Sequence, residues 1–302
     1  MWKKIRAIVT QGIMATVATQ CGGSDGKIFS SDGTDDNAAL SISVTDAPVD
    51  SVSAVVVRFS AIELEPSSGD TVTINLSPAQ QVNLLSLTDG ATTSLASNQT
   101  IEAGSYTSIR FILDASSTSQ DASYVDLTDG TRYPLVLDSD FDDGITITKT
   151  FSVDSSGRLD LVADFDLRKS IAPRNGSQYT FSPNVRVIDR ASSGNLAGTI
   201  NSNFVPSTCS PFVYVFSGND ATLTDMDSSS NTGPVVSVPV KLNIASGAYT
   251  YRASYLDAGN YTVALTCNGS TDNPATDEAL VFSRSGNAVV TANQTTTIDF
   301  TS

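Results

Sequence analysis

Histidine is missing from this chain of 302 residues, and that absence excludes several kinds of site. Without imidazole there is no Ser-His-Asp triad, no zinc or copper site built on histidine, and no side chain of the commonest general-base type. Basic residues are also scarce, since 17 lysines and arginines stand against 32 aspartates and glutamates. The net charge of −15 repels phosphate backbones, so we expect no nucleic acid among the partners.

Long apolar runs are missing as well, and no segment approaches the ~18 uninterrupted apolar residues of a transmembrane helix. The N-terminus instead has Lys3, Lys4 and Arg6 ahead of a short, mainly apolar stretch that ends in small residues. A charged start, a short apolar core and small residues before the cleavage point are typical of a secretory signal peptide. We therefore predict a signal peptide over residues 1–20 and an exported protein.

Cysteine occurs three times, and an odd count in an exported protein favours one disulfide and one leftover cysteine. Cys209 and Cys267 each stand beside a strand-like segment, so we predict a disulfide between them, with two free thiols as the alternative. Cys21 follows the predicted signal peptide, and its placement resembles that of a bacterial lipobox, whose cysteine is lipidated. Multiple acyl chains on Cys21 would hold the protein to a membrane. The alternative is a secreted protein that is cut elsewhere.

The mature chain has the pattern of β-structure. Residues 21–38 are rich in Gly, Ser and Asp and predict a flexible acidic tether. From residue 39 onward, strand-like segments alternate with turn-forming residues about every ten positions. This spacing predicts an all-β protein with two antiparallel β-sandwich domains, at residues 39–190 and 191–302, with a joint at "ASSGNLAGTI". Leu-Thr-Asp-Gly, at 87–90 and at 127–130, predicts two hairpin turns, and a short helix is expected near "QVNLLSLTDG".

Several stretches of the chain resemble one family: "LSISVTDAPVDSVSAVVVRFSAIEL", "IEAGSYTSIRFIL", "LVADFDLRKSI", and "YTFSPNVRVID" followed by "GNLAGTI". They are similar to bacterial exported lipoproteins that carry the domain of unknown function numbered forty-three eighty-two. The resemblance covers residues 39–200 and implies a β-rich domain on a bacterial surface, often lipid-anchored, with no established activity. The last third resembles prealbumin-like or carboxypeptidase-regulatory-like modules through "YLDAGNYTVALTC".

Charged residues gather in "LVADFDLRKSI". On a strand, Asp164, Asp166 and Arg168 would share one face. Such a row could bind a cation or a sugar, or it could form a charge ladder across neighbouring strands. The basic residues available for that ladder are Arg110, Arg186 and Arg190. We expect the ladder, because half-exposed strands routinely pair opposite charges.

Calcium is the one cofactor that the sequence suggests. Asp138, Asp140 and Asp142 alternate in "LDSDFDDG", and calcium prefers oxygen-rich ligand sets. The segment is no EF-hand loop, because Lys149 stands where that loop ends in glutamate. The alternative is a solvated acidic turn.

No catalytic residue is assigned from the sequence. There is no glycine-rich phosphate loop, and no pair of carboxylates stands out as the acid and base of a glycosidase. We expect a non-catalytic bacterial cell-surface lipoprotein for binding, adhesion or surface assembly, anchored on the outer membrane through its lipid. Its partner would be a surface glycan or another surface protein. The alternatives are a calcium-dependent carbohydrate-binding protein and a carboxylate-based glycan hydrolase.

Overall fold

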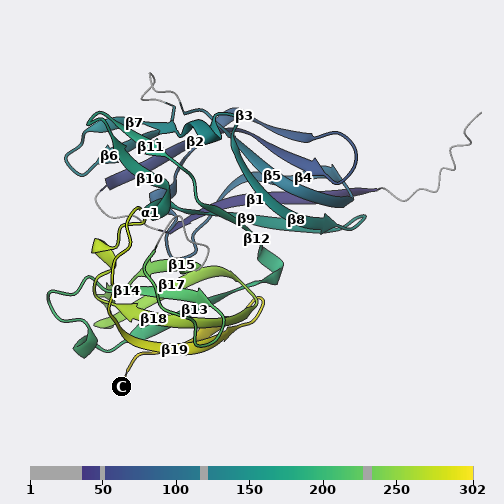
Figure 1. Ribbon diagram of the computed structural model, residues 1–302. Helices are drawn as coiled ribbons and strands as arrows, with labels where there is room; N and C mark the ends of the chain where they lie inside the picture. The colour runs from purple at the N-terminus through teal and green to yellow at the C-terminus, as the bar shows by residue number, and fades with distance from the viewer. Residues whose placement is uncertain (1–35, 48–51, 116–121, 227–232, 302) are drawn as a thin grey trace, which may run out of the picture. The chain divides into compact units, whose positions relative to one another are not determined.

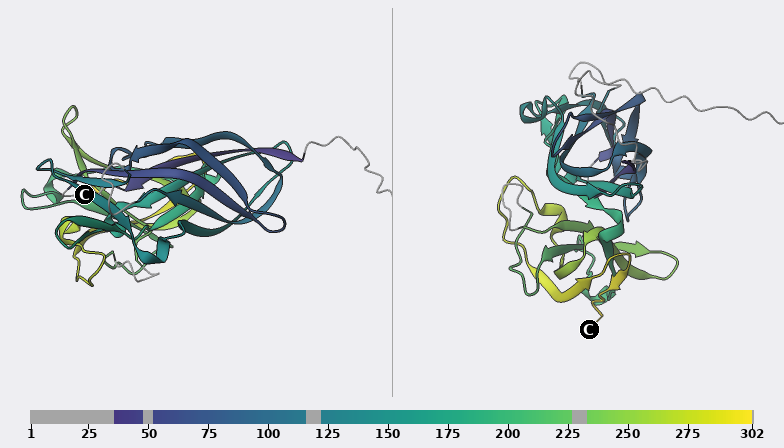
Figure 2. Two further views of the ribbon diagram at one scale, coloured as in Figure 1. Left: turned by 90° about the horizontal axis from the view of Figure 1, so that it is seen from above. Right: turned by 90° about the vertical axis from the view of Figure 1, so that its right-hand side faces the viewer.

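Strands make up most of the regular structure in the residues that the computed structural model describes, which are 36–47, 52–115, 122–226 and 233–301. Figure 1 shows two groups of strands, coloured purple to teal and green to yellow, and Figure 2 views them from two further sides. The predicted all-β fold class is confirmed. Among the described residues no helix is long and apolar enough to cross a membrane.

The first group of strands forms what we call the N-terminal sandwich, residues 36–189. Its strands are β1 (Asn37–Ala47), β2 (Val52–Pro66), β3 (Val72–Asn83), β4 (Thr93–Glu102), β5 (Gly104–Leu113), β6 (Tyr124–Leu127), β7 (Arg132–Leu137), β8 (Ile145–Val153), β9 (Arg158–Asp166), β10 (Ile171–Arg174), β11 (Gln178–Phe181) and β12 (Val185–Asp189). One sheet has the order β12-β9-β1-β4. The other has the order β10-β11-β7-β6-β2-β5-β8, with β3 paired to β2.

Alternation of apolar residues explains how these two sheets pack. On β2, every second residue from Val55 through Val57 to Phe59 is fully buried. Phe59 meets Phe111 and Phe165 edge-to-face, with ring centres 6.1 and 5.9 Å apart. The β-branched and aromatic residues of both sheets thus close one shared core.

The second group forms the C-terminal sandwich, residues 193–301. Its strands are β13 (Ser193–Ile200), β14 (Phe212–Ser217), β15 (Val236–Pro239), β16 (Lys241–Asn243), β17 (Ala248–Asp257), β18 (Gly259–Thr266), β19 (Phe282–Val290) and β20 (Thr295–Thr297). The two sheets have the orders β16-β17-β13-β20 and β15-β14-β18-β19, and they enclose a separate apolar core. The described part of the chain from residue 35 onward is one compact unit, and the division into domains at residue 190 stays a prediction.

Short helical turns connect the strands. They are α1 (Leu167–Ser170), η1 (Leu84–Ser86), η2 (Ser139–Phe141), η3 (Arg190–Ser192), η4 (Ser202–Phe204) and η5 (Gly269–Thr271). The η1 turn is the short helix expected near "QVNLLSLTDG".

The sheets are mainly antiparallel, as predicted, and three pairs of the described strands are parallel. β1 runs parallel to β9, β7 parallel to β11, and β13 parallel to β20. The other pairs of labelled strands are antiparallel. Parallel strands are usually covered on both faces, and β9 fits this rule because it is buried over most of its length.

One predicted boundary and one predicted turn are corrected. β1 begins at Asn37, so the last two residues of the predicted tether are already strand. At the predicted joint, the η3 turn is followed by β13, the first strand of the C-terminal sandwich. The 127–130 turn does join a hairpin, β6 to β7. The 87–90 turn does not, because β3 and β4 belong to different sheets.

Candidate functional site

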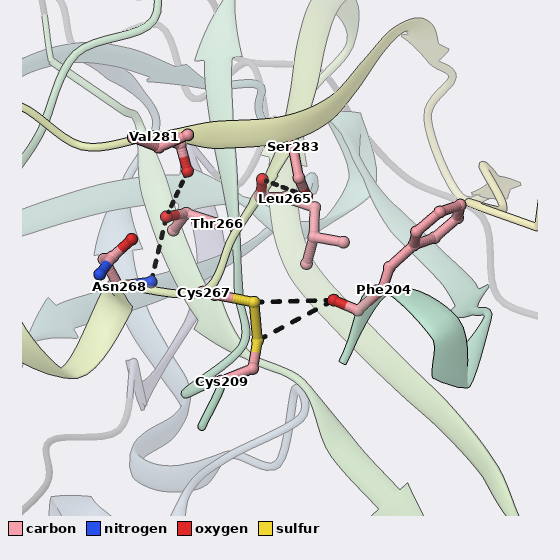
Figure 3. Close-up of a disulfide and its surroundings, with 8 residues drawn as sticks. All are labelled: Phe204, Cys209, Leu265, Thr266, Cys267, Asn268, Val281 and Ser283. Atoms are coloured by element: carbon pink, nitrogen blue, oxygen red, sulfur yellow. Dashed lines mark hydrogen bonds between the residues drawn. A yellow bond between two sulfur atoms is a disulfide. The ribbon is translucent and has the colours of Figure 1, made fainter. Parts of the chain in front are cut away.

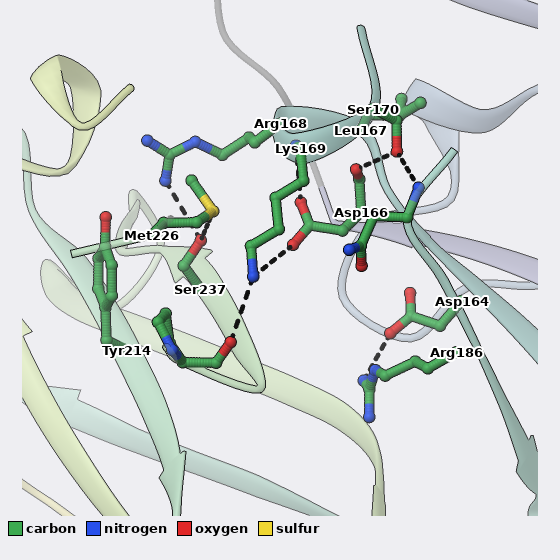
Figure 4. Close-up of polar contacts among 12 residues, drawn as sticks. Asp164, Asp166, Leu167, Arg168, Lys169, Ser170, Arg186, Tyr214, Met226 and Ser237 are labelled. Carbon is green, nitrogen blue, oxygen red and sulfur yellow. Dashed lines mark hydrogen bonds and ion pairs between the residues drawn. The ribbon is translucent and has the colours of Figure 1, made fainter. Parts of the chain in front are cut away.

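The charge cluster predicted around Asp164 and Asp166 lies where β9 ends and α1 begins (Figure 4). Asp166 ends the strand, because its carboxylate accepts a hydrogen bond from the backbone N–H of Lys169 (3.3 Å) and so caps the helical turn. The turn takes Arg168 off the strand face on which the alternating pattern had placed it. The predicted row of three charges is therefore broken after the second.

Arg168 reaches from α1 to the C-terminal sandwich and is buried (Figure 4). One of its terminal nitrogens donates to Ser237 Oγ at 3.2 Å. The other donates to the carbonyl oxygens of Gly269 and Asp272, the second at 3.3 Å. The guanidinium carbon also lies 4.5 Å from the centre of the Phe212 ring, a cation–π contact. The side chain is thus held by the protein's own acceptors and acts as a structural clamp.

Asp164 stands opposite Arg186 in the pairing of β9 with β12, and the two side chains form an ion pair. Arg186 also donates to the backbone oxygens of Tyr255 (2.9 Å) and Ser254 (3.2 Å) in the C-terminal sandwich. The structure therefore brings this pair of the predicted ladder together. Arg190, the third basic candidate, contacts Asp160 at 3.2 Å instead.

Burial raises the pKa of both Asp164 and Asp166. Desolvation is the main cause for Asp164, and the neighbouring Arg186 charge opposes it. Desolvation again leads for Asp166, opposed by Lys169, whose Nζ lies 3.9 Å from the carboxylate. The strand was expected to be half-exposed, yet β9 is buried on both faces over most of its length. The cluster is consequently a set of desolvated, paired charges.

Arg110 is far from this cluster in the fold. It lies on β5 in the sheet of β2, opposite Glu63, and its Nε donates to the Glu63 carboxylate at 2.8 Å. Its predicted place in a ladder with Asp164 and Asp166 is wrong, because β9 belongs to the other sheet. Period-two patterning identifies the face of a strand but not its sheet.

Asp138, Asp140 and Asp142 lie on and beside the η2 turn. The Asp138 carboxylate accepts from Ser182 Oγ at 3.0 Å, and this hydrogen bond lowers its pKa. In the described ranges these three carboxylates are not among the groups whose ligand oxygens lie within 4.8 Å of one another. Calcium at this turn stays a prediction.

Three other acidic residues do gather within 4.8 Å: Asp225, Asp272 and Glu278. Asp272 accepts from the Tyr214 hydroxyl and, at 3.3 Å, from the backbone N–H of Met226. Desolvation raises the pKa of Asp272. Their positions are spread over more than fifty residues of sequence, so no local motif pointed to them. Because their oxygens already accept hydrogen bonds from the protein, we assign no ion to them.

Buried tyrosines should make the protein unstable in alkali. The Tyr251 hydroxyl donates to the carbonyl of Ile298 at 2.8 Å, and burial raises its pKa above the usual 10.0. A raised pKa in the folded state gives stability that is fully present below pH ~10 and is lost as the pH rises further, because the unfolded chain releases its proton first. We expect Tyr251 alone to lower the free energy of unfolding by about 1.4 kcal/mol per pH unit in that range.

Urea unfolding followed by far-ultraviolet circular dichroism at about pH 9 to 12 measures this slope. The Tyr251→Phe variant should show a slope smaller by about 1.4 kcal/mol per pH unit, since it loses one titrating group. Tyr214, whose pKa is also raised chiefly by desolvation, is present in both proteins. Equal slopes for the two proteins would contradict the assignment.

An open polar groove lies beside the charge cluster. It has a volume of about 260 Å³, room for several water molecules. Its lining includes Gly90, Arg190, Asn195, Arg252, Tyr255 and Asn293. An adjoining hollow that reaches Asp164 holds only about 20 Å³, enough for about one water molecule. The groove is therefore the place in this region where a small ligand fits.

Gly90 and Tyr255 both line this groove. Gly90 has a φ of +86°, in the left-handed region that favours glycine, and a Cβ atom there would lie 2.5 Å from Ser254 Oγ. The Tyr255 hydroxyl donates to the Gly90 carbonyl at 2.9 Å, across a sequence separation of 165 residues. The alternation in "YRASYLD" was a signal that Arg252 faces outward, but nothing in the sequence links it to the 87–90 turn.

A disulfide joins Cys209 and Cys267, the pair predicted from the sequence (Figure 3). It ties the segment before β14 to the end of β18, and both sulfurs lie beside the carbonyl oxygen of Phe204. Closing a loop of this length stabilises a fold by about 2–4 kcal/mol. Cys21, the predicted lipidation site, and the predicted signal peptide lie outside the described residues.

Solved structures show a distant likeness to this chain. The Bacillus anthracis TIE protein is 9% identical with a TM-score of 0.21; the match covers 88% of this chain but 33% of that protein, so the chain spans about a third of its length. GBS52, the minor pilin of Streptococcus agalactiae, is 11% identical with a TM-score of 0.20, covering 86% and 94% of the two chains. The fimbrial anchor protein Mfa2 of Porphyromonas gingivalis is 8% identical with a TM-score of 0.21, covering 84% and 99%.

Comparison of the sequence with known proteins and families gives a more specific result than the solved structures. No curated protein matches the chain. One family model does match, over residues 37–183, and its description is "Domain of unknown function (DUF4382)". The matched segment holds β1 to β11 together with α1. It contains three of the stretches on which the resemblance rests and ends within the fourth. Residues 37–183, slightly under half of the chain, are thus similar to the DUF4382 family.

Proposed function

We propose that this chain is a non-catalytic lipoprotein of the bacterial cell surface that acts by binding, in adhesion or surface assembly. In this proposal it is exported, lipidated at Cys21 and held on the outer membrane. The sandwiches then face a surface glycan or another surface protein.

The Cys209–Cys267 disulfide is the observation that carries this proposal. Disulfides of this kind persist in oxidising compartments outside the cytosol. With these two cysteines paired, Cys21 is the one left over, directly behind a signal-like N-terminus. Export and an anchor are thus supported by the same three residues.

A binding role is supported by the groove next to Arg252. It is open to solvent and lined by groups that donate hydrogen bonds, while the charges of the neighbouring cluster are already paired within the protein. The names of the distant structures, a minor pilin and a fimbrial anchor, describe those proteins. The proposal for this chain depends on its own residues.

Replacing Cys21 by serine tests the anchor. In a Gram-negative host fed a labelled fatty acid, the full-length wild type should carry label, sediment with membranes and be accessible to protease on intact cells. Cys21→Ser should lose the label and appear in soluble fractions, because the acyl chains supply about 0.8 kcal/mol per buried CH₂ of membrane affinity. Adhesion of these cells to a glycan array or to partner cells should fall in parallel.

Ser24→Ala, three residues away, is the matched control and should behave as the wild type. Mass spectrometry of the mature N-terminus completes the test. An unmodified wild-type N-terminus, or one that starts downstream of residue 21, rules out the anchor. A lipidated protein that stays inaccessible on intact cells rules out the surface role.

A further inference from the structure

Arg252 differs from the other half-buried arginines of the fold. Those that contact an aspartate or glutamate are Arg58, Arg110, Arg132, Arg186 and Arg190. Arg252, on β17, has no carboxylate within ion-pair distance in the described part of the chain. Its Nε donates to Ser254 Oγ at 3.2 Å, and within the described residues its two terminal nitrogens have no hydrogen-bond partner. A half-buried guanidinium therefore faces the groove with donors to offer.

The groove around Arg252 has a positive lining in a strongly acidic protein. A second guanidinium, from Arg190, lines it, and one of its terminal nitrogens donates to the Tyr255 hydroxyl at 3.1 Å. Of the described residues that line this groove, none is an aspartate or a glutamate, although the chain carries 32 of them. Because Arg190 is paired with Asp160, Arg252 carries the uncompensated positive charge of this lining, which favours an anionic ligand at this place.

The groove is also held in shape before any ligand arrives. The Gly90 carbonyl is bonded to Tyr255, and the Asn293 side-chain amide donates to the carbonyl of Ala191 at 2.8 Å. Lys241 Nζ forms an ion pair with the Asp89 carboxylate at 2.6 Å and so holds the 87–90 turn, which contains Gly90. Walls from three separate segments are therefore fixed, which reduces the ordering cost of binding.

The chemistry of the lining selects among anions. A guanidinium fork matches the planar geometry of a carboxylate and can bind it with two parallel hydrogen bonds. The remaining polar groups, from Ser193, Ser254, Asn195 and Asn293, both donate and accept hydrogen bonds, as sugar hydroxyls do. Apolar side chains of the kind that would hold a peptide or a lipid tail are absent from the described lining.

We infer that this groove binds the carboxylate of an acidic saccharide, with Arg252 as the anchoring residue. The inference rests on the proposed binding function and gives its ligand a chemical class, a uronic-acid sugar. Arg252 holds the carboxylate, and the serine and asparagine side chains hold the ring hydroxyls. Because the attraction is electrostatic and the groove is open, binding weakens as salt is raised.

Isothermal titration calorimetry on the full chain tests this. The probes are a galacturonate trimer, the neutral galactose trimer, and an acidic peptide with a free C-terminal carboxylate. We expect binding of the galacturonate trimer and at least tenfold weaker binding of the other two. Arg252→Gln should weaken the galacturonate trimer about tenfold or more, the loss expected for hydrogen bonds to a charged group.

Arg284→Gln is the matched control, since it removes an exposed arginine from the same sandwich, on β19. It should bind as the wild type. Arg252→Lys keeps the charge without the fork and should bind between the wild type and Arg252→Gln. Circular dichroism spectra that match the wild type show that the variants are folded.

Three results would overturn the inference: no heat with the galacturonate trimer, equal affinity for the neutral trimer or the peptide, or equal loss in Arg252→Gln and Arg284→Gln. Each leaves the surface-protein proposal standing if the Cys21 experiment succeeds. Conversely, binding of galacturonate by a protein that is neither lipidated nor accessible on cells would reject the surface proposal alone.

Discussion

Arg168→Ala is expected to destabilise the protein by about 2–6 kcal/mol, because it removes the buried donor of two carbonyl oxygens, each of which costs about 1–3 kcal/mol when left unpaired. These are the carbonyl oxygens of Gly269 and Asp272, and the cation–π contact with Phe212 is lost as well. The substitution should weaken the contact between the two sandwiches, because Arg168 joins them.

Urea unfolding followed by circular dichroism measures this loss. The single tryptophan, Trp2, lies within the predicted signal peptide, so tryptophan fluorescence would not report on the mature fold. Arg174→Ala, at an exposed position on β10, is the control and should change stability by less than about 0.5 kcal/mol. Arg168→Lys, which keeps the charge, should lie between the two. A loss below about 1 kcal/mol for Arg168→Ala would show that the clamp contributes little.

Phe165→Ala is the second substitution with a large expected effect, a loss of about 3–5 kcal/mol. The Phe165 ring is fully buried, with ring centres of Phe59, Phe111 and Phe181 at 5.9, 6.2 and 6.4 Å. Truncation at this place removes apolar burial and leaves a cavity that the three aromatic neighbours and the two sheets cannot readily fill. The loss of stability should arise in the core of the N-terminal sandwich.

The same unfolding measurement serves here, with the midpoint expected to fall at an unchanged denaturant slope. Val281→Ala removes apolar atoms from a side chain that is 70% exposed, and it should change stability by less than about 0.5 kcal/mol. A Phe165→Ala protein as stable as Val281→Ala would mean that the aromatic cluster does not hold the two sheets together.

β9 shows which structural features could be predicted from the sequence and which could not. Its alternation predicted that Asp164 and Asp166 lie on one face of a strand, because the period of two is a local property of the chain. The same pattern predicted a half-exposed second face, yet Asp164 is buried beside groups of the C-terminal sandwich. Contacts between distant segments are set by the whole fold, and a single strand does not record them.

In the candidate site, too, some features could be predicted from the sequence and others could not. The Cys209–Cys267 disulfide could be predicted from the number of cysteines and from the oxidising compartment that export implies. The α1 turn is a single turn of four residues, too short for any helical period to show, so the direction of Arg168 could not be predicted. The groove at Arg252 joins β17 to the 87–90 turn, and that turn had been predicted as an ordinary hairpin.

The place of β1 in its sheet has a mechanical consequence. It lies between β4 and β9, and nine of its residues, from 39 to 47, are in parallel register with β9. If the chain is held at Cys21 and pulled by a partner bound to the C-terminal sandwich, tension enters along β1. The hydrogen bonds on both flanks are then loaded in shear and must break together, whereas a strand peeled from one end loses them singly.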